Sequence, residues 1–318
     1  MENDLPQSLI AAVRYFADLS TCNEYMARIK WPGGKPVCPK CGEDRIAEIG
    51  DGKRLRCKDC RAKFSYKVGT IFEDSPLGLD KWFVAVWSIA NCKNGISSHE
   101  LGRALDVTQK TAWFMLHRIR EAMKSGTFKK LKGEVESDET FIGGEARNMH
   151  AGKREKKIRG RGSVNKTIVH GLLERSEPSQ VRASVVGSTE ANTLLPEVRR
   201  NVEHGANVYT DGHTGYADLC LTHRHETVDH IEKYVSGRVH TNGLENFWSL
   251  LKRGLKGTYV AVAPYHLKRY VDEQAFRFNK RLGSDATRFV DAMAGVVGRR
   301  LKWRELTAQD DCGFMGLT

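Results

Sequence analysis

Two pairs of cysteines constrain the fold of this chain more than any other feature. Cys38 and Cys41 form one pair, Cys57 and Cys60 form the other, and fifteen residues separate the pairs. This spacing can place four thiolates tetrahedrally around a zinc ion, and four sulfur ligands leave no open position for a catalytic water. We therefore predict a structural zinc site, with accidental spacing or a redox pair as the alternatives.

The segment between the two pairs has the pattern of a β-hairpin. Residues 46–49 and 55–57 are rich in alternating apolar side chains, and they flank Asp51 and Gly52. An Asp-Gly dipeptide favours the tight turns with positive φ that join two strands. Turn chemistry and ligand spacing thus predict the same small zinc-bound unit.

The composition favours a folded protein with a polyanionic partner. The chain has 318 residues, 40% of them hydrophobic, and a formal net charge of +12. From Lys233 to Arg304 there are fifteen Lys or Arg and only five Asp or Glu. Clustered cations gain affinity for phosphates by releasing counterions, so nucleic acid is the leading candidate partner.

Neither a membrane segment nor a signal peptide is expected. No apolar run approaches the roughly 18 residues of a membrane helix, and the first residues lack a basic and apolar signal pattern. We expect a cytoplasmic, nucleoid-associated protein without membrane contact, in which thiols stay reduced.

Residues 96–120 have the pattern of two helices joined by a short turn. Ser97 or Ser98 can cap the first helix and Thr108 the second. The expected apolar face of the first helix includes Ala104. In a helix-turn-helix the second helix enters the major groove, and a helical hairpin between two domains is the alternative. The residues expected to face DNA are Gln109, Lys110, Thr111 and Arg118.

Acidic residues occur on a predicted strand that runs from residue 134 to a pair of glycines at 143–144. Alternation along a strand places Glu136, Asp138 and Thr140 on one face and Glu139 on the other. Asp138 is one of several carboxylates here that could bind a metal ion.

Two further acids follow later in the chain. Asp211 ends a short apolar strand, 207–211, and Glu245 lies in the first turn of a predicted helix, with thirty-three residues between the two acids. An Asp-Gly sequence is often only a turn, and Asn242 with Glu245 also fits a helix-capping box. Two strand-borne aspartates and a helix-borne glutamate can instead converge on a pair of Mg²⁺ or Mn²⁺ ions and support phosphoryl transfer.

The chain resembles bacterial insertion-sequence transposases that have an N-terminal zinc ribbon and a DDE-type catalytic domain, the group related to the eukaryotic Merlin transposons. The resemblance covers nearly the whole chain. It rests on the four ribbon cysteines and on the segments Asp138–Gly144, Thr210–Tyr216 and His240–Gly254.

The resemblance implies an α/β fold with an RNase H-like mixed-sheet domain behind the zinc ribbon and the helix-turn-helix. Asp138 and Asp211 match the first two acids of the family. Glu245 fits the third, with Asn242 in reserve because some relatives place Asn there. His213 and His240 could orient water or phosphate, or serve structural roles.

The family also implies a reaction and its partners. The enzyme would cut double-stranded DNA at terminal inverted repeats and join the freed 3′ hydroxyl to target DNA, acting as a homo-oligomer. Two other functions fit less well: a catalytically inactive regulator derived from a transposase, and an RNase H-like nuclease or resolvase.

Basic segments surround the predicted site. Residues 147–166 contain eight Lys or Arg and one acid, a pattern typical of a loop that orders on DNA, although an exposed loop without a partner is also possible. Phosphate contacts are expected from Arg154, Lys156, Lys157, Arg159, Lys252, Arg253 and Lys256. Asp272 and Glu273, on a predicted helix that starts at Pro264, are interpreted as surface charges.

Three domains are predicted along the chain. Residues 1–78 would form the N-terminal helices and the zinc ribbon, and residues 79–130 the helix-turn-helix region. Residues 131–318 would form the catalytic domain with its C-terminal helices.

Overall fold

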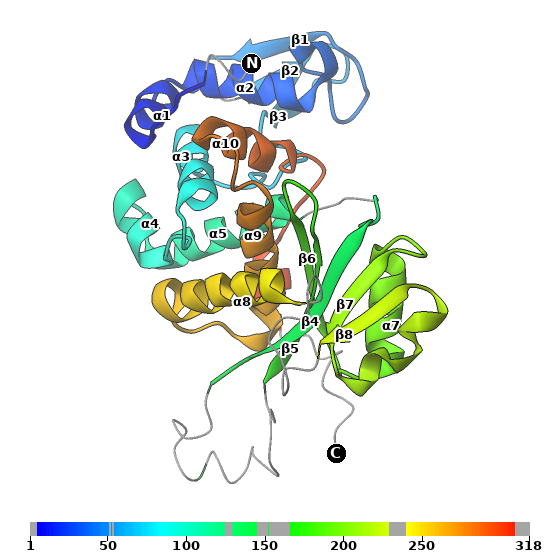
Figure 1. Cartoon of the computed structure of the whole chain (residues 1–318). Coiled ribbons are helices and arrows are strands. Elements are labelled where there is room, and N and C mark those ends of the chain that lie inside the picture. The colour runs from blue at the N-terminus through cyan, green and yellow to red at the C-terminus, as the bar shows by residue number, and fades with distance from the viewer. Residues whose placement is uncertain are drawn as a thin grey trace. The chain divides into compact units, whose positions relative to one another are not determined.

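A computed structural model describes residues 5–50, 52, 54–124, 129–144, 152, 166–228 and 240–308 (Figure 1). The chain divides into two compact units. Unit 1 combines residues 1–124 with residues 283–318, and unit 2 comprises residues 125–282. None of the helices in the described parts is long and apolar enough to cross a membrane.

Unit 1 contains a small sheet and a set of helices. The sheet is antiparallel, in the order β1-β2-β3. Its elements are α1 (Leu9–Phe16), α2 (Leu19–Lys30), the short 3₁₀ helix η2 (Pro32–Gly34), β1 (Ile46–Ile49), β2 (Arg54–Cys57), β3 (Lys63–Ser65), α3 (Leu79–Asn91), α4 (Ser98–Leu105), α5 (Gln109–Met123), α10 (Asp285–Ala294) and α11 (Trp303–Thr307).

The predicted hairpin is confirmed as β1 and β2. The two strands pair from Ile46 with Cys57 to Ile49 with Arg54. Gly52, between them, has a φ of +63°, which a glycine adopts without steric cost. The hairpin thereby brings Cys57 back toward the first pair of cysteines.

Helices α4 and α5 begin where the sequence predicts. Ser97 caps α4 in a capping box with Glu100, and the Thr108 hydroxyl accepts a hydrogen bond of 3.2 Å from the Thr111 amide at the start of α5. Asp106, in the left-handed conformation, makes the turn between the helices. The expectation for Ala104 was wrong, because its side chain is exposed.

An aromatic cluster in the core of unit 1 includes a residue from the C-terminal segment. The ring of Phe289 on α10 lies 5.1 Å from Phe16, 6.0 Å from Phe83 and 5.5 Å from Trp87, measured between centroids. The sequence prediction placed residues 131–318 in one domain. In the structure the chain after residue 282 belongs to unit 1, so this prediction is corrected.

Unit 2 is built on a five-stranded mixed sheet in the order β6-β5-β4-β7-β8. The first three strands form an antiparallel meander, and β7 and β8 run parallel to β4. This mixed sheet agrees with the predicted RNase H-like fold. Its elements are β4 (Glu134–Ile142), β5 (Thr167–Glu174), β6 (Gln180–Val186), α7 (Ala191–Asn201), β7 (Asn207–Asp211), η4 (Thr214–Leu221), β8 (Arg224–Val228), α8 (Asn242–Gly254), the π-helical turn η5 (Leu255–Tyr259), η6 (Pro264–His266) and α9 (Leu267–Asn279).

Helices cover both faces of this sheet. On one face, α7 and η4 pack on Val135 and Val208. On the other, α8 and α9 pack on Val169 and Val181. Because alternate residues of a strand point to opposite faces, β4 contributes side chains to both layers.

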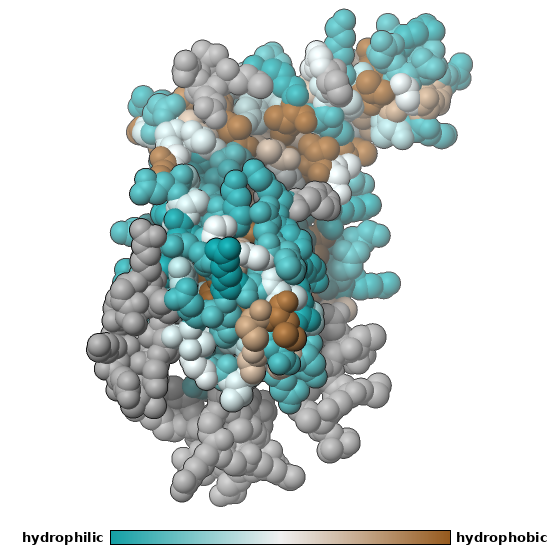
Figure 2. Space-filling view, turned by 45° about the vertical axis from the view of Figure 1, so that its right-hand side comes forward, coloured by the Kyte–Doolittle hydropathy of each residue, from teal (hydrophilic) through white to brown (hydrophobic). Residues whose placement is uncertain are grey.

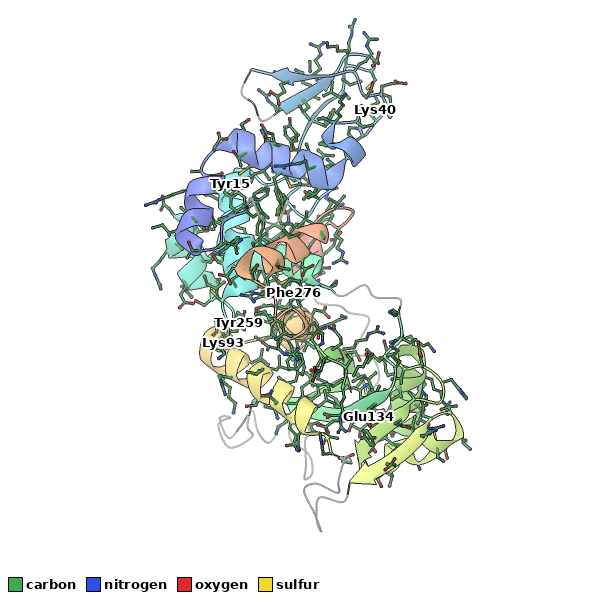
Figure 3. All side chains as sticks on the ribbon, turned by 45° about the horizontal axis from the view of Figure 1, so that its top comes forward. Tyr15, Lys40, Lys93, Glu134, Tyr259 and Phe276 are labelled. Atoms are coloured by element: carbon green, nitrogen blue, oxygen red, sulfur yellow. The ribbon has the colours of Figure 1, made fainter. Side chains whose placement is uncertain are left out.

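The acids of α9 are buried, which corrects their interpretation as surface charges. Glu273 is fully buried and pairs with Arg277, while Asp272 pairs with Lys268 at 2.9 Å. The hydroxyl of Tyr259, which is labelled in Figure 3, also donates to Glu273. A buried carboxylate is tolerated only when it is paired and hydrogen-bonded in this way.

Hydrophilic side chains dominate the face of the molecule shown in Figure 2, and hydrophobic ones form separate patches. In unit 2, exposed large apolar side chains include Leu221, Val260 and Leu282. Isolated exposed apolar residues are ordinary, but an apolar residue beside a groove or a ligand site is informative.

Replacing Phe289 with Ala should destabilise unit 1 by about 3–5 kcal/mol, the usual cost of removing a buried phenyl ring. Thermal and urea unfolding of the full chain would measure this loss. Leu282→Ala, at a side chain that is 76% exposed in unit 2, is the matched control and should change little. Equal stability of the Phe289→Ala variant and the wild type would contradict the assignment of α10 to this core.

Candidate active site and zinc centre

The four cysteines of the ribbon lie together. All four sulfur atoms are within 4.8 Å of one another, with 3.5 Å between Cys38 and Cys60 and 3.6 Å between Cys41 and Cys57. Four sulfurs about 2.3 Å from a central zinc ion would stand roughly 3.8 Å apart, close to these distances. The amide of Lys40 also donates to the Cys38 sulfur at 3.4 Å, a contact that stabilises a thiolate. The cluster fits a structural zinc ion.

The two strand-borne aspartates lie at the same level of neighbouring strands. β4 and β7 are parallel, and Glu134, Val135 and Glu136 pair with residues 207, 208 and 209. Continuing this register by two residues puts Asp138 level with Asp211. The sheet therefore brings together two acids that are far apart in the sequence.

The electrostatics of Asp138 indicate that three acids lie near one another. Burial raises the pKa of Asp138 to about 6, and the negative charges of Asp211 and Glu245 add to this increase. A hydrogen bond from Trp248 opposes it. Like charges raise a carboxyl pKa, so Asp211 and Glu245 both lie within electrostatic range of Asp138.

Trp248 connects the helix that carries Glu245 to the strand that carries Asp138. Its indole Nε1 donates to Asp138 Oδ2 at 2.8 Å. Gly171, the partner of Asp138 on β5, provides the space for this ring, because a Cβ atom at Gly171 would lie 2.6 Å from Trp248 Cζ2. Strand pairing, a glycine and an indole together fix the carboxylate.

Glu136, one of the possible metal carboxylates, is occupied by protein groups. It is 1% exposed and accepts from Arg175 Nε at 2.8 Å and from the amide of Leu244 at 2.9 Å. Arg175 also donates to Nδ1 of His240 at 2.8 Å. Glu136 thus attaches the start of α8 to the sheet, and His240 has a structural partner.

Glu139 points to the opposite face from Asp138, as strand alternation predicts. It accepts a hydrogen bond from the hydroxyl of Tyr216, to which Ser137 Oγ in turn donates at 3.0 Å. Burial, together with the charges of Asp138 and Asp211, raises the pKa of Glu139 to about 7. Strand alternation predicted the face on which this fourth nearby acid lies but no role for it.

The first turn of α8 shows no capping box. The helix begins at Asn242, its N-cap is Thr241, and the Thr241 side chain makes no capping hydrogen bond. Glu245 is exposed and lies one residue beyond the N3 position that a capping box requires. Asn242 is also exposed. The structure therefore does not support the alternative that Glu245 serves only in a capping box with Asn242.

The acidic trio is more open than the cysteine cluster. Within the described parts of the chain, only the four cysteines form a group of three or more His, Cys, Asp or Glu whose ligand atoms gather within 4.8 Å.

Two of the predicted DNA-facing residues of α5 are exposed. Gln109 and Lys110 lie on the surface, whereas Thr111 is half-buried and bonds to the Thr108 hydroxyl at 2.8 Å. The ammonium group of Lys110 lies 4.9 Å from the ring centroid of Trp303. The start of α5 therefore presents a polar and basic surface.

Arg118 does not belong to this surface, and its prediction as a DNA contact is corrected. The residue is 3% exposed, and its guanidinium donates to the carbonyl of Glu73 and lies over the rings of Trp82 and Phe114. The prediction assumed that α5 is buried along one apolar stripe only. In the structure α5 is buried on several sides, so Arg118 is covered as well.

The remaining predicted contacts fall into two groups. Lys252, Arg253 and Lys256 are exposed along α8 and the turn that follows. Arg154, Lys156, Lys157 and Arg159 lie outside the described residues.

Comparison with known proteins identifies two domains in the chain. Residues 130–279 match the model of an ISXO2-like transposase domain, and residues 20–63 match a transposase zinc-ribbon domain. A protein of Halobacterium salinarum, named an uncharacterized protein in transposable element ISH50, is 30% identical over 256 residues, which are 76% of this chain and 85% of that protein. No solved structure matches the chain.

The zinc-ribbon match includes the four clustered cysteines, and the transposase match includes the strands and the helix that carry the three acids. The relative resembles the chain across both regions. The chain therefore belongs to the family of insertion-sequence transposases that combine a zinc ribbon with an ISXO2-like transposase domain.

Proposed function

We propose that this transposase binds the terminal inverted repeats of its element, cuts the DNA strands there and transfers the freed 3′ end to target DNA. The observation that supports the proposal is the strand register, which places Asp138 level with Asp211, and the charge of Glu245 adds to the raised pKa of Asp138. Divalent cations, Mg²⁺ or Mn²⁺, would activate the attacking oxygen and stabilise the departing one.

Each acid has a distinct setting for this role. Asp138 is held by Trp248, Asp211 accepts a hydrogen bond of 3.2 Å from the amide of His213 two residues on, and Glu245 is exposed. Asp138 would be an oriented metal ligand, and Asp211 and Glu245 would be adjustable ones. Such a set suits ions that bind substrate phosphate as well as protein. The other residues of the site position these three.

DNA recognition is assigned to two surfaces. The start of α5, with Gln109 and Lys110, would enter the major groove as the second helix of a helix-turn-helix. Lys252, Arg253 and Lys256 would bind backbone phosphates beside the acids. The basic segment 147–166 would add phosphate contacts, and two or more copies of the chain would act together on paired ends.

The decisive experiment uses DNA that carries the inverted repeats flanking the coding sequence. Incubation with the full chain and Mg²⁺, followed by mapping of the 3′ ends, should reveal cuts at the repeat ends. Binding without cleavage would favour a DNA-binding regulator, and cleavage that depends on branched structure would favour a nuclease or resolvase.

The substitutions Asp138→Asn, Asp211→Asn and Glu245→Gln should each reduce end cleavage by roughly two to three orders of magnitude, as does the loss of one group that stabilises a transition state. DNA affinity and melting temperature should remain near the wild-type values. Asn242→Ala is the control and should keep its activity. If it lost cleavage while Glu245→Gln retained it, Asn242 would be the third residue of the site.

Removal of one ribbon cysteine should abolish zinc binding. The wild-type protein should contain one zinc ion per chain by elemental analysis, and Cys57→Ser should contain little, with a less stable ribbon, because three thiolates hold the ion weakly. Cys220→Ser, at an exposed cysteine of unit 2, should retain full zinc. Full zinc content in Cys57→Ser would contradict the four-cysteine site.

Substitutions on the two sides of α5 should have different effects. Lys110→Ala should weaken DNA binding and reduce the slope of log affinity against log salt by about 0.9, the value for one lost phosphate contact. Arg118→Ala should instead lower stability by about 1–3 kcal/mol, because the buried carbonyl of Glu73 loses a partner. An unchanged salt slope in Lys110→Ala would remove this residue from the DNA surface.

A further inference from the structure

A groove of about 1060 Å³ lies in unit 2, between the end of β4 and the end of α8. Its apolar floor includes Phe141, Leu255 and Val260. Three lysines also line it, Lys166, Lys252 and Lys256, and no carboxylate does so among the residues that the structure describes. An apolar floor with a cationic rim suits a ligand that has flat apolar faces and a negatively charged backbone.

We propose that this groove binds unpaired nucleotides of the DNA next to the cleavage site, with bases against the apolar floor and phosphates against the lysines. The inference rests on the proposed function in taking DNA as the ligand. It adds a conformational requirement, because bases inside a paired duplex are stacked and cannot reach such a floor. The proposed groove therefore selects or stabilises a locally opened end.

The position of the groove along the protein supports this ligand. Lys252 lies seven residues after Glu245 on the same face of α8, about 10 Å along the helix axis at 1.5 Å per residue. Ile142 lies four residues after Asp138, about 13 Å along β4 at roughly 3.3 Å per residue. At about 3.4 Å per nucleotide along a strand, the groove begins three to four nucleotides from the acids.

Two apolar side chains at this groove are exposed in the part of the chain that the structure describes. Val260 is 78% exposed, and Phe141 is 37% exposed. Val260 also has a φ of +60°, an unfavourable conformation for a β-branched residue, and its amide donates to the carbonyl of Leu255 at 2.9 Å to close the π-helical turn. Such strain is typical of functional sites, and apolar side chains are used in this way to separate stacked bases.

The lysines and the apolar floor should contribute different parts of the affinity. Lysine contacts with phosphate do not depend on whether a base is present, so they set the salt dependence. Contact with the aromatic or apolar floor requires that a base is present, but any of the four bases can make it. This difference permits a test without knowledge of the repeat sequence.

The test compares two forked duplexes that differ only in their unpaired arms, which are thymidines in one and abasic sites in the other. Binding to the full zinc-loaded chain is measured by fluorescence anisotropy without Mg²⁺, so that no strand is cut. The wild type should bind the thymidine fork about tenfold more tightly, the gain typical of one stacked base. Val260→Gly should bring this ratio close to one.

Two controls make the comparison specific. Glycine accepts a φ of +60°, so Val260→Gly should fold normally. Leu282→Gly, at another exposed apolar residue of unit 2, should keep the wild-type ratio. Lys256→Ala should weaken binding of both forks equally and leave the ratio intact.

A wild-type ratio near one would overturn the inference, as would a tenfold ratio that survives in Val260→Gly or disappears in Leu282→Gly. The proposed function can fail separately. A protein that prefers the thymidine fork but never cuts repeat ends would refute strand transfer and leave the groove assignment standing. A protein that cuts repeat ends but shows no fork preference would refute the groove assignment and leave the proposed function standing.

Discussion

The contact between Trp248 and Asp138 is the interaction on which the candidate active site depends. The acids of β4 and β7 come together through strand pairing alone, but Glu245 belongs to a helix that has to be docked on the sheet. The indole N–H of Trp248 fixes that helix three residues away from Glu245, and the carboxylate of Glu136 fixes its start through the amide of Leu244. Buried hydrogen bonds of this kind are costly to leave unmade, so they define one helix position.

Small residues make this docking possible. Gly171 lies where a side chain would collide with the Trp248 ring, and Gly243 lies where a Cβ atom would approach Glu136 Oε2 to 2.8 Å. Both glycines have ordinary backbone conformations, so their value here is the space they leave for neighbouring groups. The close approach of helix and sheet is therefore encoded by residues that carry no functional group themselves.

Most of the local structure could be predicted from the sequence, because it depends on short-range patterns. Cysteine spacing indicated the zinc centre, capping residues located α4 and α5, and alternation placed Asp138 and Glu139 on opposite faces of β4. The possible convergence of the three acids was inferred from their positions on two strands and a helix, and the family resemblance supported it. The register of Asp138 with Asp211 comes from long-range strand pairing that no single segment encodes.

The errors arose where tertiary contacts decide exposure. Arg118 and Glu273 look like surface charges because each lies beside polar neighbours in the sequence, yet both are buried against partners from other turns or segments. Phe289 would fill an aromatic core equally well in either unit, so its sequence could not indicate that α10 packs with α3. Whether a long charged side chain is buried, and which of two cores a helix joins, depends on contacts between segments that are distant in the sequence.

Negative charge is concentrated at the candidate site. Burial and neighbouring charges raise the pKa of Asp138 to about 6 and that of Glu139 to about 7, so a concentration of negative charge is held there at a cost in free energy. Hydrogen bonds from Trp248 and Tyr216 offset part of that cost and keep each carboxylate in a fixed orientation. If the acids bind a divalent cation, as proposed, its charge would offset the remaining repulsion. The hydrogen bonds of Trp248 and Tyr216 would then contribute to the metal affinity by orienting the carboxylates, although neither group needs to touch the metal.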